Sequence, residues 1–139
     1  MKKCKKLPII IILICAIIIG AISYFLYFER PFETISINEI EEVKVYAVPP
    51  DGEVVLSKEQ VESIVPLLQN LKVCNPGYEV LVMGGQTVSI KVRKTDGLTM
   101  EIVNNGNIQI IIDGKAYKAD YATAEAINQF ANKVLETGF

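Results

Sequence analysis

The chain contains no histidine, and this absence limits the chemistry that it can perform. Histidine is the side chain that most often moves protons near neutral pH. Without it, neither a Ser-His-Asp nor a Cys-His catalytic arrangement is possible. Zinc sites that depend on histidine are excluded as well. We find no complete set of nucleophile, base and stabilising group, so the sequence predicts a protein that is not an enzyme.

The remaining candidates for catalysis or cofactor binding are few. Glu79 and Glu101 are carboxylates that could approach each other across a sheet, which keeps a carboxylate hydrolase as the enzymatic alternative. The glycine-rich segment Met83-Gly84-Gly85-Gln86 is short and matches a turn better than a phosphate-binding loop. Cys74 is the lone cysteine after residue 28 and is expected to be a small buried apolar residue, with a reactive thiol or an intermolecular bridge as the alternative. One cysteine cannot form a thiolate cluster for zinc. The sequence therefore predicts no cofactor and no metal.

One group of polar residues has the spacing of a binding surface. Ser89, Lys91 and Arg93 alternate with apolar residues, and Thr99 and Glu101 do the same a few residues later. Side chains that alternate along a strand face one side of the sheet. Antiparallel sheets often leave such a face in contact with water, so an ordinary solvent face is the simpler interpretation. The functional interpretation is a mixed-charge interaction face, extended by a free sheet edge that could accept a partner strand.

Tight turns position these polar residues on neighbouring strands. Asp96-Gly97, Asn105-Gly106 and Asp113-Gly114 favour the positive φ values that two-residue hairpins need. From Gln86 to Tyr117 the chain therefore reads as an antiparallel meander. Upstream, further strands are expected over Val43 to Val48, Glu53 to Leu56 and Tyr78 to Val82.

Two amphipathic helices are expected to cover one face of this sheet. Ser57 and Gln60 have the spacing of a capping box, and apolar residues recur at helical spacing from about Lys58 to Leu71. Pro66 lies inside this pattern and should kink the helix or end it early. A second helix is expected from Thr123 to Thr137. The sequence predicts an α+β fold, in which a two-layer domain packs an antiparallel β-meander against two helices.

The first 28 residues predict a location rather than a reaction. Lys2, Lys3, Lys5 and Lys6 precede an uncharged run, 7–28, whose length as a helix is roughly 33 Å. We therefore expect a cytoplasmic basic tail (1–6), a transmembrane signal anchor (7–28), a juxtamembrane linker (29–42) and an extracytoplasmic domain (43–139). The positive-inside rule places the N-terminus in the cytoplasm and the domain outside, at the cell membrane.

Two alternatives to the anchor remain at this stage. The small residues Ala21 and Ser23 allow cleavage after Ser23, which would release a secreted protein. A lipoprotein signal modified on Cys15 fits poorly, because bulky Leu13 and Ile14 precede this cysteine.

The charge of the part after residue 28 limits which class of partner the domain can bind. All of the 16 acidic residues follow residue 28, whereas several of the 14 basic residues precede it. The domain is therefore net negative, which argues against nucleic acid as a partner.

In overall layout the chain resembles small, uncharacterised single-pass proteins of Gram-positive bacteria. The resemblance is carried by the lysine-flanked apolar segment, the single α+β domain and the helix start Leu56-Ser57-Lys58-Glu59. It implies membrane anchoring and transfers no site residues.

The function expected from the sequence is a membrane-tethered, extracytoplasmic protein-interaction module, acting as an accessory, sensor or immunity-type protein. The alternative is an extracytoplasmic binder of a small ligand or cell-wall fragment, held between the sheet and the helices.

Overall fold

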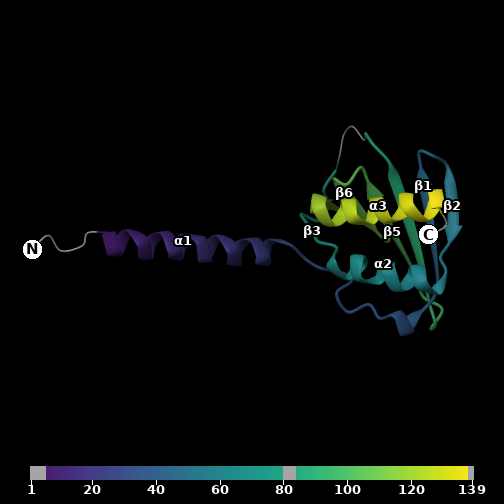
Figure 1. The fold of residues 1–139 in the computed structure, drawn as a ribbon, viewed down its shortest axis with the longest axis horizontal. Helices are drawn as coiled ribbons and strands as arrows, with labels where there is room; N and C mark the ends of the chain where they lie inside the picture. The colour runs from purple at the N-terminus through teal and green to yellow at the C-terminus, as the bar shows by residue number, and fades with distance from the viewer. Residues whose placement is uncertain (1–5, 80–83, 138–139) are drawn as a thin grey trace, which may run out of the picture.

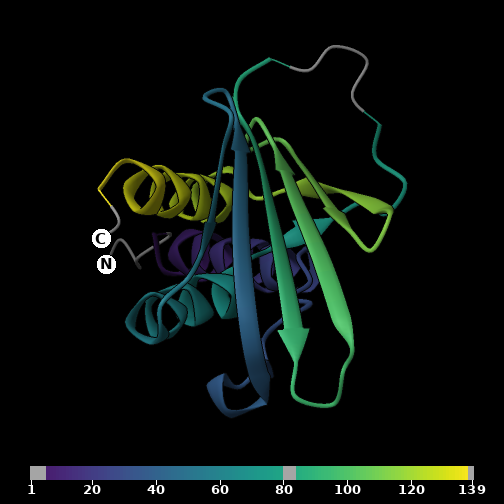
Figure 2. The same cartoon turned by 90° about the vertical axis from the view of Figure 1, so that its right-hand side faces the viewer.

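The computed structural model describes residues 6–79 and 84–137, which form an antiparallel sheet covered on one face by helices (Figures 1 and 2). The elements in chain order are α1 (Lys6–Tyr27), η1 (Ile37–Glu39), β1 (Ile40–Val48), β2 (Gly52–Val55), α2 (Lys58–Asn70), β3 (Val73–Cys74), β4 (Thr87–Lys94), β5 (Thr99–Asn105), β6 (Gln109–Ile112), β7 (Lys115–Ala119) and α3 (Tyr121–Thr137). The expected α+β class is confirmed. The strand predicted over Tyr78 to Val82 lies partly outside the described residues.

The sheet has the strand order β2-β1-β4-β5-β6-β7-β3, and every pair in it is antiparallel. The predicted meander forms its centre as β4 to β7. Asp113 (φ 47°) and Gly114 (φ 85°) form a two-residue turn as predicted. The other two turns are longer than predicted, because residues 95–97 and 106–108 connect their strands and Asn105 still belongs to β5. The sequence did not predict that β1 pairs with β4, or that β3 completes the sheet beside β7.

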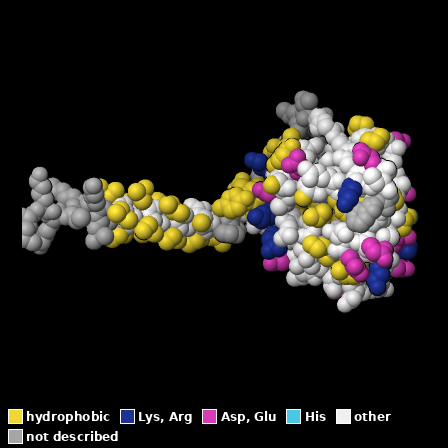
Figure 3. Space-filling view, viewed as in Figure 1, with side chains coloured by type: hydrophobic (Ala, Val, Ile, Leu, Met, Phe, Trp, Pro, Cys, Tyr) yellow, Lys and Arg dark blue, Asp and Glu magenta, His cyan; other side chains and the backbone are white. Residues whose placement is uncertain are grey.

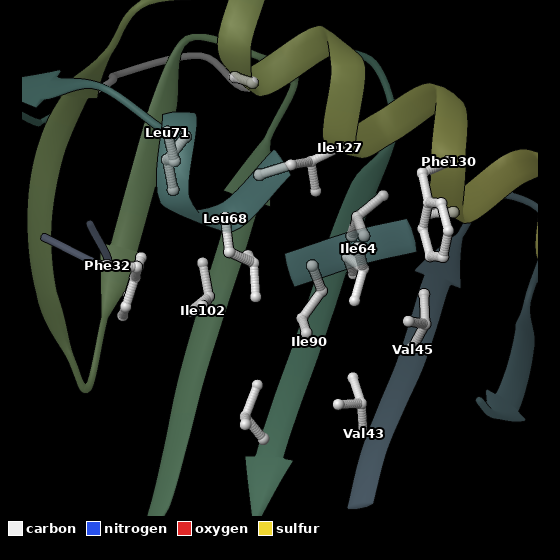
Figure 4. Packing of buried hydrophobic residues seen from close by; sticks show 14 of the residues in the cluster. Phe32, Val43, Val45, Ile64, Leu68, Leu71, Ile90, Ile102, Ile127 and Phe130 are labelled. Atoms are coloured by element: carbon white, nitrogen blue, oxygen red, sulfur yellow. The ribbon is translucent and has the colours of Figure 1, made fainter. Parts of the chain in front are cut away.

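The hydrophobic core lies between the sheet and the helices α2 and α3 (Figure 4). Ile64 and Leu68 of α2 and Ile127 of α3 are fully buried against strand residues such as Ile90 and Ile102. Buried apolar side chains of the sheet and of both helices form this layer. Among the helices that the structure describes, none covers the opposite face of the sheet (Figure 2).

The start of α2 agrees with its sequence pattern. The backbone N–H of Gln60 donates to the Ser57 hydroxyl at 3.3 Å, and the N–H of Ser57 donates to the Gln60 side chain at 2.8 Å. The helix continues past Pro66 to Asn70. Pro66 is exposed, so water can reach the backbone carbonyl that lacks its helical partner.

Residues 29–42 are more closely integrated than a linker. Phe32 and Ile35 are buried in the core. Glu29 and Val73 form an antiparallel bridge, with N···O distances of 2.7 and 2.9 Å, and β1 begins already at Ile40. The charged residues of this segment suggested a solvated linker, but its few apolar residues fix it to the domain.

The helix α1 extends away from the sheet (Figure 1), and its large apolar side chains are exposed (Figure 3). At Tyr24 it already contacts the domain, because the Tyr24 hydroxyl donates to the Asp120 carboxylate at 3.3 Å. The Lys72 ammonium lies 5.5 Å from the centre of the same ring.

The structure corrects the interpretation of the N-terminus. Among the helices of the described residues, none combines enough length with enough apolar character to cross a membrane. The predictions of a transmembrane signal anchor over 7–28, of a single-pass protein and of the resulting location at the cell membrane are therefore wrong on this finding.

Candidate functional site

The candidate site is the sheet face opposite the helices, which we call the open face. It consists of the outward-pointing residues of four neighbouring strands: Lys44 and Tyr46 of β1, Glu53 and Val55 of β2, Thr87, Ser89, Lys91 and Arg93 of β4, and Thr99, Glu101 and Val103 of β5. Their inward-pointing neighbours, such as Val45 and Ile90, are buried. Strict alternation along the strands thus separates the core from this polar surface.

All five interaction residues predicted from the sequence lie on this face. In the ladder between β4 and β5, Lys91 is opposite Glu101, and Arg93 is opposite Thr99. The Lys91 ammonium lies 3.7 Å from the Glu101 carboxylate, which also accepts a 3.3 Å hydrogen bond from the Ser89 hydroxyl. Because they project from strands, these groups are held more firmly than side chains on loops would be.

The open face contains a cavity of about 410 Å³. Its lining is Lys44, Tyr46, Glu53, Thr87, Ser89, Lys91, Glu101 and Val103. Three of the predicted residues therefore line it, whereas Arg93 and Thr99 lie on the face outside it. The lining combines positive charges, carboxylates and hydroxyl groups, so it can both donate and accept hydrogen bonds.

The predicted interaction residues did not include five of the eight residues that line this cavity. Lys44 and Tyr46 alternate with buried residues in β1, so their outward orientation was predictable from the strand pattern. Their position beside Ser89 and Lys91 was not, because it depends on the pairing of β1 with β4. Glu53 joins the cavity only because β2 folds back on β1.

Ion pairs neutralise most of the charge on the open face. Lys44 is directly opposite Lys91, an arrangement of like charges that is unfavourable by itself. A carboxylate near each lysine offsets this repulsion, because Glu42 lies 3.8 Å from Lys44 and Glu101 lies 3.7 Å from Lys91. Arg93 lies 3.7 Å from Glu42 and 3.2 Å from Glu41, so Lys44, Glu42 and Arg93 form one linked group beside the Lys91–Glu101 pair. Exposed pairs of this kind each contribute only about 0–1 kcal/mol to stability.

The hydroxyl of Tyr46 is held in its protonated form. A side-chain hydrogen bond with Asp51 raises the pKa of Tyr46 above 10.0, and partial desolvation and the charges of Asp51 and Glu53 raise it further. At neutral pH, Tyr46 therefore remains an uncharged ring with a hydroxyl group at the edge of the cavity.

A chain of buried polar side chains borders the open face beyond β5. The Asn105 amide donates to the Gln109 side chain at 2.9 Å and accepts from the Thr87 hydroxyl at 3.2 Å. Gln109 in turn donates to the carbonyl of Tyr78 at 2.9 Å. Asn105 and Gln109 are each 7% exposed, so these two side chains contribute little to the accessible surface. The accessible polar surface is therefore the part formed by β2, β1, β4 and β5.

The other candidates from the sequence do not assemble into a site. The structure pairs Glu101 with Lys91 and records no contact between Glu101 and Glu79. Gly85 has a φ of 94°, as in a turn. Cys74 is buried, as expected. Among residues 6–79 and 84–137, no three histidine, cysteine, aspartate or glutamate side chains are grouped so that they could hold a metal ion.

Comparisons with known proteins identify no relative of this chain. No protein-family model matches it. No curated protein and no solved structure is significantly similar.

Proposed function

We propose that the protein is a protein-interaction module that binds another protein through the open face of its sheet. The observation that carries the proposal is the cavity in this face, where Lys44, Lys91, Glu53 and Glu101 project from paired strands around Tyr46. Charged groups in a fixed arrangement discriminate between partners by electrostatic complementarity. Tyrosine and arginine, here Tyr46 and Arg93, are side chains that protein interfaces use often.

The helix-covered face supports the same choice. Core side chains occupy that side of the sheet, so a partner cannot reach the strands through the helix-covered face. The absence of histidine and of a three-residue metal-binding group among the described residues leaves binding as the better-supported kind of activity.

Site-specific photo-crosslinking tests this proposal. A photoreactive amino acid replaces Tyr46 on the open face, and in a matched control it replaces Glu62 on the exposed side of α2. We expect a discrete crosslinked product from position 46 that is absent from position 62. The charge reversal Lys91→Glu should abolish the product, whereas Lys58→Glu on α2 should leave it unchanged. Equal products from both positions, or a product insensitive to Lys91→Glu, would refute the proposal.

A second candidate function is the binding of a small ligand or cell-wall fragment in the same cavity. Its volume of about 410 Å³ lies within the range of 300–1,000 Å³ that is typical of ligand pockets. The mixed lining favours a ligand that carries both an ammonium and a carboxylate group. A thermal-shift screen with amino acids and short peptides separates the two functions. A bound ligand raises the melting temperature of the parent protein but not that of Lys91→Glu.

A further inference from the structure

The two edges of the sheet differ in what covers them. At one edge, Glu29 forms backbone hydrogen bonds to Val73 of β3 and thus continues the sheet with the protein's own chain. At the other edge lies β2, on the side of the domain away from α1 (Figure 1). Beyond its pairing with β1, the described residues contribute no strand or bridge to β2.

The pairing of β2 with β1 shows which backbone groups face outward. The N–H of Leu56 donates to the carbonyl of Val43 at 2.9 Å, so this opposed pair is a hydrogen-bonded one. In an antiparallel ladder, hydrogen-bonded and non-hydrogen-bonded pairs alternate. Val54 therefore bonds to β1, whereas the N–H and C=O groups of Glu53 and Val55 point away from the sheet. Each of these two residues offers one donor and one acceptor at the edge.

The side chains of these two residues lie on the open face. Glu53 lines the cavity, and no lysine or arginine of the described chain forms a salt bridge with it, although Glu42 and Glu101 are both paired. Val55 is 53% exposed. The edge thus presents a carboxylate and an apolar side chain next to each other on one face.

We propose that β2 accepts an extended segment of a partner protein as an additional antiparallel strand. This inference rests on the proposed function and deepens it by specifying the chemistry of the partner. Antiparallel pairing places an apolar partner residue opposite Val55 and, two positions later in the partner, a lysine or arginine opposite Glu53. Opposite charges on directly opposed residues stabilise such a pair, and like charges destabilise it. Backbone hydrogen bonds then provide affinity and the alternate side chains provide specificity.

The partner strand would also enlarge the binding surface. Its side chains on the open face would lie beside the cavity, next to Tyr46, which is opposite Glu53 in β1. The edge strand and the cavity would therefore contact the same partner.

A peptide titration of the full chain tests the inference. The probe is the blocked peptide Thr-Val-Thr-Lys-Thr, and the matched control peptide carries Glu in place of Lys. We expect the lysine peptide to bind at least about tenfold more tightly than the glutamate peptide, and the Val55 and Glu53 amides to become protected from hydrogen exchange. Equal affinity of the two peptides, or no binding of the lysine peptide at millimolar concentration, would overturn the inference.

Two substitutions of Val55 test whether its outward-pointing N–H bonds to the partner strand. Val55→Pro removes the outward-pointing N–H without removing a bond of β2 to β1, and it should weaken binding by about tenfold. Val55→Thr keeps this N–H and a β-branched side chain, so it should change binding less than about twofold. Circular dichroism and thermal unfolding establish that each variant is folded. If Val55→Pro does not fold, Glu53→Lys decides instead, because it should reverse the preference in favour of the glutamate peptide.

The outcomes separate this inference from the proposed function. If crosslinking from position 46 depends on Lys91 but is insensitive to Val55→Pro and Glu53→Lys, the open face binds a partner and strand addition is wrong. If a concentration-dependent dimer forms and Val55→Pro dissociates it, the added strand belongs to a second copy, which overturns the assignment to a partner protein.

Discussion

At the scale of single residues, the most consequential buried polar group is Asn104. It is 1% exposed, on the core side of β5. Its amide donates to the carbonyl of Ala124 at 2.8 Å and to Asn107 at 2.9 Å, and its oxygen accepts the N–H of Asn107 at 3.0 Å. One side chain therefore joins the turn after β5 to the first turn of α3.

Replacing this side chain should be costly. Asn104→Ala leaves the Asn107 N–H and the Ala124 carbonyl without these partners, so we expect a loss of about 2–3 kcal/mol in the free energy of unfolding. Chemical denaturation measures it. Thr99→Ala, at an exposed position of the same strand, serves as the control and should cost less than about 1 kcal/mol. Similar losses for both variants would show that the Asn104 bonds are unimportant.

A second residue-scale prediction concerns pH. The first turn of α2 lowers the pKa of Glu59 below 4.5, mainly through its own backbone N–H and then through the Ser57 hydroxyl and the charge of Lys58. Because the pKa of Glu59 is lower in the folded state, the unfolded state binds more protons at pH values around and between the folded-state and unfolded-state pKa. The stabilisation by Glu59 is therefore present above the unfolded-state pKa and is lost as the pH falls through the folded-state pKa.

The variant Glu59→Gln should remove this contribution. We expect its melting temperature to lie below that of the parent at pH 6 and to approach it at about pH 3. Glu62→Gln, at an exposed position of the same helix, is the control. A constant difference between Glu59→Gln and the parent at all pH values would contradict the assignment.

At the scale of elements, α2 contains a local defect. Pro66 lies well inside this helix, where it cannot donate the hydrogen bond to the residue four positions earlier. Its ring is exposed, so an alanine there removes no buried contact. Pro66→Ala should therefore stabilise the protein by about 1–2 kcal/mol, less than the full cost of a helical proline because the unfolded chain also gains freedom. Thermal unfolding measures the effect. Ser63→Ala on the same helix should be nearly neutral, and a destabilised Pro66→Ala would contradict this account.

The elements also show which parts of the fold could be predicted from the sequence. The capping box of α2 and the glycine turns of the meander were predictable because each depends on residues a few positions apart. The pairing of β1 with β4 was not, since it joins segments about 40 residues apart and leaves no local pattern. The same division applies to the site. Ser89, Lys91 and Glu101 follow from hairpin alternation, whereas Lys44, Tyr46 and Glu53 enter the cavity only through long-range pairing.

At the scale of the whole molecule, the segment before β1 decides where the folded unit begins. The sequence predicts a domain that begins at residue 43, but Phe32 and Ile35 pack in its core and Glu29 pairs with β3. Arg30 adds a contact with the end of α2, because its guanidinium donates to the carbonyl of Gln69 at 3.1 Å. A chain without these residues would expose the apolar surface that they cover and leave the β3 edge open.

Two truncated chains test whether the folded unit begins before residue 29 or at residue 43. A chain that begins at Phe28 keeps every contact of this segment with the domain, and we expect it to unfold cooperatively at a melting temperature close to that of the full chain. A chain that begins at Val43 loses two buried side chains, each with a cost of about 2–5 kcal/mol, which together approach the total stability of a small domain. It should therefore lose its cooperative unfolding transition. The point variant Phe32→Ala in the full chain provides the intermediate case, with a loss of about 3–5 kcal/mol. Equal stability of the two truncated chains would instead place the start of the folded unit at β1, and the Glu29–Val73 bridge would then be a peripheral contact.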